Sequence, residues 1–287
     1  MPKKQQAKIT RPYLWQNLTV EEIRTLINRG CRTVLVPLGV VEQHGYHLTT
    51  FTDCHLAWEI SVRIARKSDC FVAPLYPYLF SGGTLPGTIN VSPETVVMVI
   101  SDISDSLFSQ GILNVLFILG HGGSENYQAL MNFKHLYFHK RPHFADRLMA
   151  VIPVWELSSR WSQECKKKKD FHAGEFETSL MLALAAKRVH LNRRSLDKPA
   201  LARKMREDPD WYQKVEKALN LPWVAPHVSQ RPEIKVGVMG DPFLASRSLG
   251  GKLVKEIVTT GLKLLKQVTN RKIGQRIPVV LTRHSIF

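Results

Sequence analysis

Short apolar runs alternate with longer amphipathic stretches along most of this chain, and this alternation is the feature that most restricts its fold. The runs are rich in β-branched residues, as buried strands are, and they cover residues 33–38, 70–75, 115–119 and 149–154. Stretches with helical spacing separate them. Repeated strand and helix units predict an α/β protein with a mostly parallel sheet and helices on both of its faces.

Several expected helices carry recognisable end signals. Thr19 is followed three residues later by Glu22, which forms a capping box, and Ser92-Pro93 opens a long helix that should end at Gly111. The last long helix contains Gly250-Gly251, which we expect to be a weak point. Further helices are expected over residues 20–30, 56–67, 129–138, 178–187 and 245–268.

The length of the chain predicts one large domain over residues 1–287. With 287 residues and 44% hydrophobic content, the chain can bury a sizeable core. Residues 199–233 interrupt the alternation, because they are charged and carry Trp211, Tyr212 and Trp223 among several prolines. Such a segment is a lid, an oligomer contact or a plain surface excursion.

Composition restricts the location and the partners of the protein. Met1–Gln6 is basic but precedes no apolar segment, and no stretch has the length of a membrane span, so we expect a soluble, cytoplasmic protein. The scattered cysteines predict reduced thiols. The net charge is +16, yet lysine and arginine are spread along the chain without a nucleic-acid-binding motif, so nucleic acid is not the expected partner.

Glu42-Gln43-His44 follows the first buried run, and Asp53 comes nine residues after the histidine. If this stretch is extended, Glu42 and His44 face one centre while Gln43 turns away. A glutamate and a histidine with this spacing usually lie in an ordinary loop and bind no metal. The other polar clusters of the chain make a metal site the better interpretation.

Two more polar clusters occur beside apolar runs, Gly120-His121-Gly122-Gly123 and His172–Ser179. In open α/β sheets the ligand crevice lies at the carboxyl ends of the strands, where these clusters would meet. Mixed carboxylate and imidazole donors suit Zn, Mn or Fe better than Ca or Mg. A carboxylate that bridges two cations would give a dinuclear site with a hydroxide nucleophile.

The order of these motifs resembles the creatininase (creatinine amidohydrolase) family. The resemblance rests on Val36–Asp53, on Leu85–Thr88 with Ser92–Thr95, on Gly120–Gly123, on His172–Leu184 and on Gly240–Pro242. It implies a three-layer α/β/α fold, two divalent metals per subunit and hydrolysis of C–N bonds in small cyclic amides or formamides. It also implies a homo-oligomer, a hexamer by the family's pattern.

Residue roles follow from the same resemblance. Glu42, Asp53 and His121 would hold one metal, and His44 with a bridging Asp53 would hold the other. His172 matches a histidine beside the substrate that transfers a proton to the leaving nitrogen. Two further residues are expected to contact substrate, Ser81 by resemblance and Trp155 from its place after a predicted strand, although Trp155 fits the core equally well.

The chain departs from the family pattern at Gly122 and Gly123, where creatininases proper have an aromatic residue and a glutamate that completes the second metal. Glu177 is the first candidate for the missing ligand and a catalytic carboxylate, and Glu125 is the second. Glu177 could equally serve as a helix-dipole partner. Lys166–Lys169 stands where creatininases have a tryptophan-bearing loop, so creatinine is not the expected substrate.

The lysine run is read as a solvated loop, or as a feature that attracts an anionic substrate. The predicted function is hydrolysis of a small cyclic amide, lactam or formamide by metal-activated hydroxide. Hydrolytic C–C ring opening of a cyclic, inosose-like ketone on the same site is one alternative. A basic protein that keeps the fold but binds a polyanion is the alternative from another class.

Overall fold

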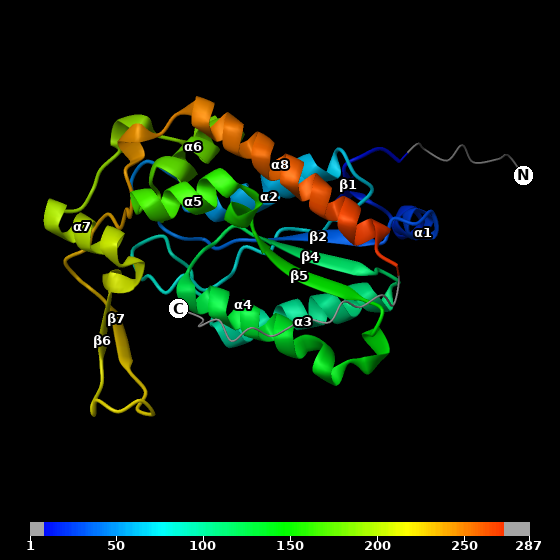
Figure 1. Cartoon of the computed structure of the whole chain (residues 1–287), viewed down its shortest axis with the longest axis horizontal. Helices are drawn as coiled ribbons and strands as arrows, with labels where there is room; N and C mark the ends of the chain where they lie inside the picture. The colour runs from blue at the N-terminus through cyan, green and yellow to red at the C-terminus, as the bar shows by residue number, and fades with distance from the viewer. Residues whose placement is uncertain (1–8, 273–287) are drawn as a thin grey trace, which may run out of the picture.

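A parallel five-stranded sheet forms the centre of the computed structural model, which describes residues 9–272 (Figure 1). Met1–Gln6 lies outside these residues. Every pairing in the sheet is parallel, as the alternation of strands and helices predicts. The strand order is β1 (Tyr13–Leu14), β3 (Phe71–Val72), β2 (Thr33–Leu38), β4 (Asn114–Leu119) and β5 (Leu148–Pro153).

Helices cover both faces of the sheet and give the expected three layers. One face carries α2 (Thr52–Ala65), α6 (Glu175–Leu184) and α8 (Arg247–Asn270). The other face carries α1 (Val20–Asn28), α3 (Pro93–Ser109) and α4 (Ser124–Leu136). In the part of the chain that the structure describes, no helix is both long and apolar enough to cross a membrane.

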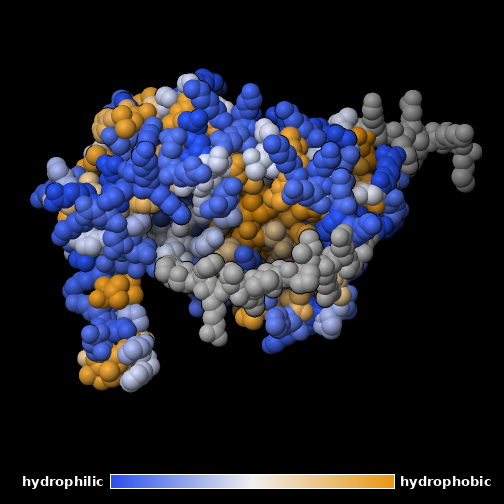
Figure 2. Space-filling model, viewed as in Figure 1, coloured by the Kyte–Doolittle hydropathy of each residue, from blue (hydrophilic) through white to orange (hydrophobic). Residues whose placement is uncertain are grey.

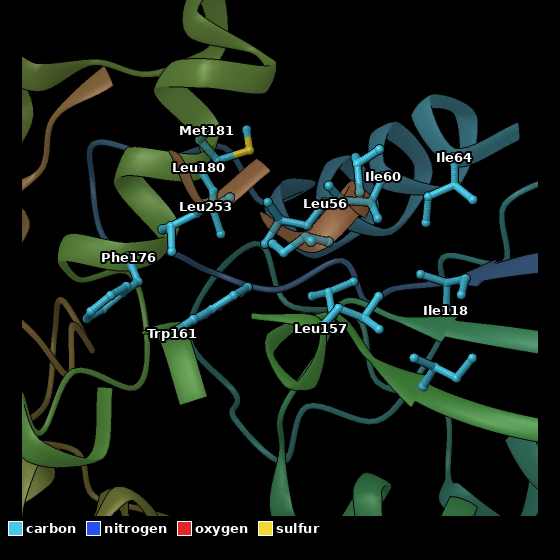
Figure 3. Packing of buried hydrophobic residues seen from close by; sticks show 14 of the residues in the cluster. Leu56, Ile60, Ile64, Ile118, Leu157, Trp161, Phe176, Leu180, Met181 and Leu253 are labelled. Carbon is cyan, nitrogen blue, oxygen red and sulfur yellow. The ribbon is translucent and has the colours of Figure 1, made fainter. Parts of the chain in front are cut away.

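Side-chain alternation along the strands divides the core into two clusters. Leu116 and Ile118 of β4 point to the face of α2, α6 and α8, whereas Val115 and Phe117 point to the face of α3 and α4. Figure 3 shows leucine and isoleucine side chains of α2 directed at residues of α6 and α8 and at Ile118 in the first cluster. Both central strands are fully buried.

Helix ends agree with the sequence signals in part. Thr19 and Glu22 form the predicted capping box, and Ser92 accepts from the amide of Thr95 at the start of α3. The helix expected from residue 178 begins at Glu175. The expected weak point at Gly250-Gly251 does not interrupt α8, because Gly250 packs against the backbone of α6.

Lys166–Lys169 are exposed, as expected of a solvated run, but the expectation of a loop was wrong. Lys166 to Lys168 form the last turn of α5 (Ser159–Lys168), and Lys169 is its left-handed C-cap with φ 54°. Basic side chains are favourable at a helix C-terminus because they offset the helix dipole. Lys168 also forms an ion pair with Glu175 at 2.7 Å.

The segment at residues 199–233 contains regular structure. It forms α7 (Pro199–Glu207), a short 3-10 turn (Pro209–Tyr212) and an antiparallel hairpin of β6 (Gln213–Glu216) and β7 (His227–Gln230). Figure 1 shows this hairpin projecting away from the three layers as a separate arm.

Candidate metal centre and active site

The predicted donor residues meet at the carboxyl end of the central strands. Glu42 and His44 lie in the loop after β2, and Asp53 lies in the first turn of α2. His121 follows β4, and Glu177 lies in the first turn of α6. Parallel strands end at the same edge of a sheet, which is why residues distant in sequence come together here.

Gly120 lets the turn after β4 approach α2 closely. A Cβ at this position would lie 2.2 Å from the carbonyl oxygen of Asp53, so only glycine fits. This close approach places the imidazole of His121 against the Asp53 carboxylate. The glycine-rich turn is therefore part of how the site is built.

Glu42, Asp53 and His121 form the first group of donors. His121 Nδ1 lies 3.0 Å from Asp53 Oδ2 and 3.2 Å from Glu42 Oε2. All three side chains are buried. Glu42 Oε2 makes no hydrogen bond of acceptable geometry within the described residues, despite its short distance to His121.

His44, Asp53 and Glu177 form the second group. His44 Nε2 lies 3.2 Å from Asp53 Oδ1 and 3.7 Å from Glu177 Oε2. Asp53 thus directs one oxygen to each group, and each oxygen faces a different histidine. The arrangement suits a carboxylate that bridges two cations.

Hydrogen bonds on the outer nitrogens orient both imidazoles. His44 Nδ1 lies 3.0 Å from the carbonyl of Glu42, and His121 Nε2 lies 3.1 Å from the carbonyl of Phe80 and 3.2 Å from the amide nitrogen of Gly123. The other nitrogen of each ring faces the carboxylates and is the one available to a cation. Metal-ligating histidines in proteins are usually held in this way.

The electrostatics of the cluster favour positive charge. Burial opposes the charge on His44, but Asp53, Glu177 and Glu42 together outweigh it and raise the pKa of His44 to about 10. Burial also opposes the charge on His121, but Glu42 and Asp53 together outweigh it, so that the pKa of His121 is well above its usual value. Burial raises the pKa of Glu177 to about 7. The buried carboxylates therefore need positive charge beside them, which protonated histidines or bound metal ions can supply.

His172 lies beside the first donor group. Its Nδ1 is 4.0 Å from Glu42 Oε2, and its Nε2 is 2.9 Å from the carbonyl of Gln43. Burial and the positive charge on His44 lower the pKa of His172 to about 4, so the ring is neutral at pH 7. A neutral imidazole at this position can accept a proton.

The expectation that Gln43 turns away from the site was wrong. Its side-chain nitrogen lies 3.1 Å from His172 Nε2, and it lines the cavity at the site. Alternation of side chains holds only in extended strands, whereas Gly45 here has φ 63° and its amide donates back to the side chain of Gln43.

The backbone at position 123 leaves no room for the glutamate that creatininases proper have there. A Cβ there would lie 2.4 Å from His121 Nε2, so a larger residue would displace the histidine. Glu125 points elsewhere and accepts from Gln213 Nε2 at 2.5 Å, whereas Glu177 lies in the donor cluster. Glu177 also accepts a hydrogen bond from the amide of Ala173, just before α6. The same side chain therefore also lies where a partner for the helix dipole is expected.

A cavity of about 660 Å³ opens onto the donor cluster. Ser81 lies in its wall and donates to Glu42 Oε1 at 2.5 Å. Trp155 lines the cavity and also packs against both core clusters, which reconciles the two interpretations of this residue. Of the lysine run, Lys166 lines the cavity.

Sequence reasoning offered a lid as one interpretation of residues 199–233 but did not assign Tyr212 or Gln230 to the site. Tyr212 and Gln230 line the cavity although they belong to the turn before the hairpin and to the hairpin itself. An aromatic residue in a charged segment was the available signal, but it gives no direction for the side chain.

The family model for creatininase, described as creatinine amidohydrolase, matches residues 16–265. The chain belongs to the creatininase family. The creatinine amidohydrolase of Pseudomonas putida is 26% identical over 192 residues, which are 61% of this chain and 73% of that protein. A crystal structure of creatininase superposes with a TM-score of 0.71 at 21% identity, covering 92% of this chain and all of the other, and shows the same fold.

Two further relatives of this creatininase-family chain carry other names. A 3-dehydro-scyllo-inosose hydrolase of Thermotoga maritima is 27% identical over 61% of this chain, and a mycofactocin precursor peptide peptidase of Mycolicibacterium smegmatis is 26% identical over 53%. The matches span 57% and 58% of those proteins. Solved creatininases include a manganese form and a zinc–zinc form, both with a TM-score of 0.70.

Proposed function

We propose that this creatininase-family hydrolase cleaves the C–N bond of a small cyclic amide, lactam or formamide at a two-metal centre. The observation that carries the proposal is the position of Asp53 between the two donor groups. Its Oδ1 lies 3.2 Å from His44 Nε2, and its Oδ2 lies 3.0 Å from His121 Nδ1. A pure binding protein would not need this buried set of donors, which argues against the polyanion-binding alternative.

Each donor group would hold one cation. Glu42, Asp53 and His121 would bind the first, and His44, Asp53 and Glu177 would bind the second. Oxygen and imidazole donors in this ratio suit Zn, Mn or Fe. When bound, two such cations supply an acidified water as nucleophile and stabilise the oxyanion that forms.

His172 is the proposed proton carrier. Nε2 of the neutral ring lies 2.9 Å from the carbonyl of Gln43 and 3.1 Å from the side-chain nitrogen of Gln43, and Nδ1 faces Glu42. A neutral imidazole at this position can accept a proton during attack and return it to the departing nitrogen. Glu177, whose pKa burial raises to about 7, is the proposed second catalytic carboxylate as well as a ligand.

The cavity guides the choice of substrate. Ser81 and Trp155 are the proposed substrate contacts, and Lys166 on the wall would attract an anionic group. A volume of about 660 Å³ lies in the range of cavities that hold drug-sized ligands, so the substrate can be larger than creatinine. The inosose hydrolase and the peptide peptidase among the relatives make ring opening at a C–C bond or peptide cleavage the second candidates.

We also propose, from the family resemblance, that the protein assembles into a homo-oligomer, specifically a hexamer. Sedimentation of the purified protein tests it. A monomer at micromolar concentration would rule it out.

Metal content and turnover together test the main proposal. Purified protein should contain two cations per chain, and Glu177→Ala should retain one, because the second donor group loses a ligand. Glu125→Gln, the matched control, should retain two. Activity is then screened over cyclic amides, formamides, cyclic ketones and short peptides with the identified metal supplied. Full activity after complete removal of metal would refute the proposal.

A further inference from the structure

Residues 209–230 divide into a base that touches the site and an arm that leaves it. The base comprises Tyr212, Gln213 and Gln230 at the open end of the hairpin; Tyr212 and Gln230 line the cavity, and Gln213 pairs with Gln230. The arm carries exposed apolar side chains, which Figure 2 shows as orange patches on the projecting hairpin. These side chains are Val215, Leu219, Leu221, Trp223 and Val228.

The base holds the glycine-rich loop at residues 80–88 at two points. Tyr212 Oη donates to the carbonyl of Ser81 at 3.4 Å, and Gln230 Oε1 accepts from the amide of Thr84 at 2.5 Å and from its hydroxyl at 3.2 Å. Gly82 makes the approach of Tyr212 possible. Its φ is +84°, and a Cβ there would lie 2.5 Å from the tyrosine oxygen.

The same loop holds the first donor group. Ser81 Oγ donates to Glu42 Oε1 at 2.5 Å, and the carbonyl of Phe80 lies 3.1 Å from His121 Nε2. The outer contacts of the second group do not involve this loop. His44 Nδ1 lies 3.0 Å from the backbone carbonyl of Glu42, and Glu177 accepts from the amide of Ala173.

We propose that the base of residues 209–230 is a clamp that fixes the first donor group through the loop at residues 80–88. Tyr212 and Gln230 are its positioning residues, since they touch the loop and not the donors. Loss of a group bonded directly to a ligand side chain, as Ser81 is to Glu42, usually costs about 10-fold to 100-fold in metal affinity, and Tyr212 and Gln230 act one contact further out, so we expect the lower end of this range. This inference rests on the proposed two-metal site.

The clamp predicts an effect on one of two cations. Gln230→Met removes the acceptor for Thr84 and keeps the length of the side chain, and Tyr212→Phe removes one hydroxyl. Co²⁺ is titrated into the metal-free full chain, with calorimetry for affinity and the visible absorption of Co²⁺ for coordination. We expect about 10-fold weaker binding of one Co²⁺ ion, with a changed absorption band, and an unchanged affinity for the other.

Three controls separate a clamp from general damage. Gln230→Glu keeps the acceptor oxygen and should restore the affinity, Trp223→Ser changes only the arm, and circular dichroism verifies the fold of each variant. Equal weakening of both ions, or no weakening in folded Gln230→Met and Tyr212→Phe, would overturn the clamp while the two-metal proposal stands. A wild-type chain that binds no Co²⁺ would overturn both.

Discussion

Asp197 organises the segment that borders His172, and its removal should destabilise the protein strongly. The Asp197 carboxylate accepts from three consecutive backbone amides, those of Lys235, Val236 and Gly237, at distances of 2.7 to 3.2 Å. Asp197 is 8% exposed. Two residues further on, Met239 pairs with His172 through backbone hydrogen bonds, so the same segment supports the site.

The expected cost of Asp197→Ala follows from these bonds. A hydrogen bond to a charged group contributes roughly 1.5 to 3 kcal/mol, and three such bonds share one carboxylate here. Because the bonds are not independent and water can enter the vacated space, we expect a loss of about 4 kcal/mol in the free energy of unfolding. At about 2 °C per kcal/mol for a chain of this size, the melting temperature should fall by about 8 °C.

Urea denaturation followed by tryptophan fluorescence measures the loss. Asp197→Asn keeps one acceptor oxygen and should lose about half as much. Asp102→Ala, on an exposed position of α3, should change the free energy of unfolding by less than about 0.5 kcal/mol. If Asp197→Ala costs less than about 1 kcal/mol, the three amides do not depend on this carboxylate and the reasoning fails.

Two further predictions concern α8 and the buried histidine near the site. Gly250→Ala should destabilise by more than about 2 kcal/mol, since its Cβ would lie 1.8 Å from a backbone oxygen of α6, whereas Gly251→Ala meets no atom within 4 Å and should stabilise by about 0.5 to 1 kcal/mol. Thermal unfolding of both variants checks the pair, and equal shifts would contradict it. Burial and the charge on His44 lower the pKa of His47 to about 4, so the folded protein resists its protonation and stability should fall as the pH drops from about 6.5 to 4. In His47→Gln the slope of unfolding free energy against pH in this window should be smaller by up to about 1.4 kcal/mol per pH unit, and coinciding slopes would exclude the effect.

Local signals predicted the elements of the fold well. Thr33–Leu38 and the run before Gly120 become strands because an unbroken apolar run is compatible with burial on both faces of a parallel sheet. Thr19 and Glu22 cap a helix through contacts three residues apart, which need no tertiary information. The family resemblance supplied the order of the donors, and the structure brings these donors together.

The errors arose where tertiary contacts decide the local conformation. Four lysines in a row resemble a solvated loop, but Lys166 to Lys168 complete a helix whose carbonyl end attracts positive charge. Gln43 points to His172 because the chain turns at Gly45. The role of Tyr212 depends on a contact with Ser81, 131 positions away, which no local pattern encodes.

The position of the donors along the chain has a consequence for folding kinetics. Asp53 and His121 are 68 positions apart, and Glu177 comes from a still later segment, so a complete donor set requires that most of the sheet and α6 have already assembled. Contacts between such distant segments form late, because closing long loops costs chain entropy first. Tight capture of two cations would therefore mark the end of folding, and a cation that is held would slow unfolding more than it speeds folding.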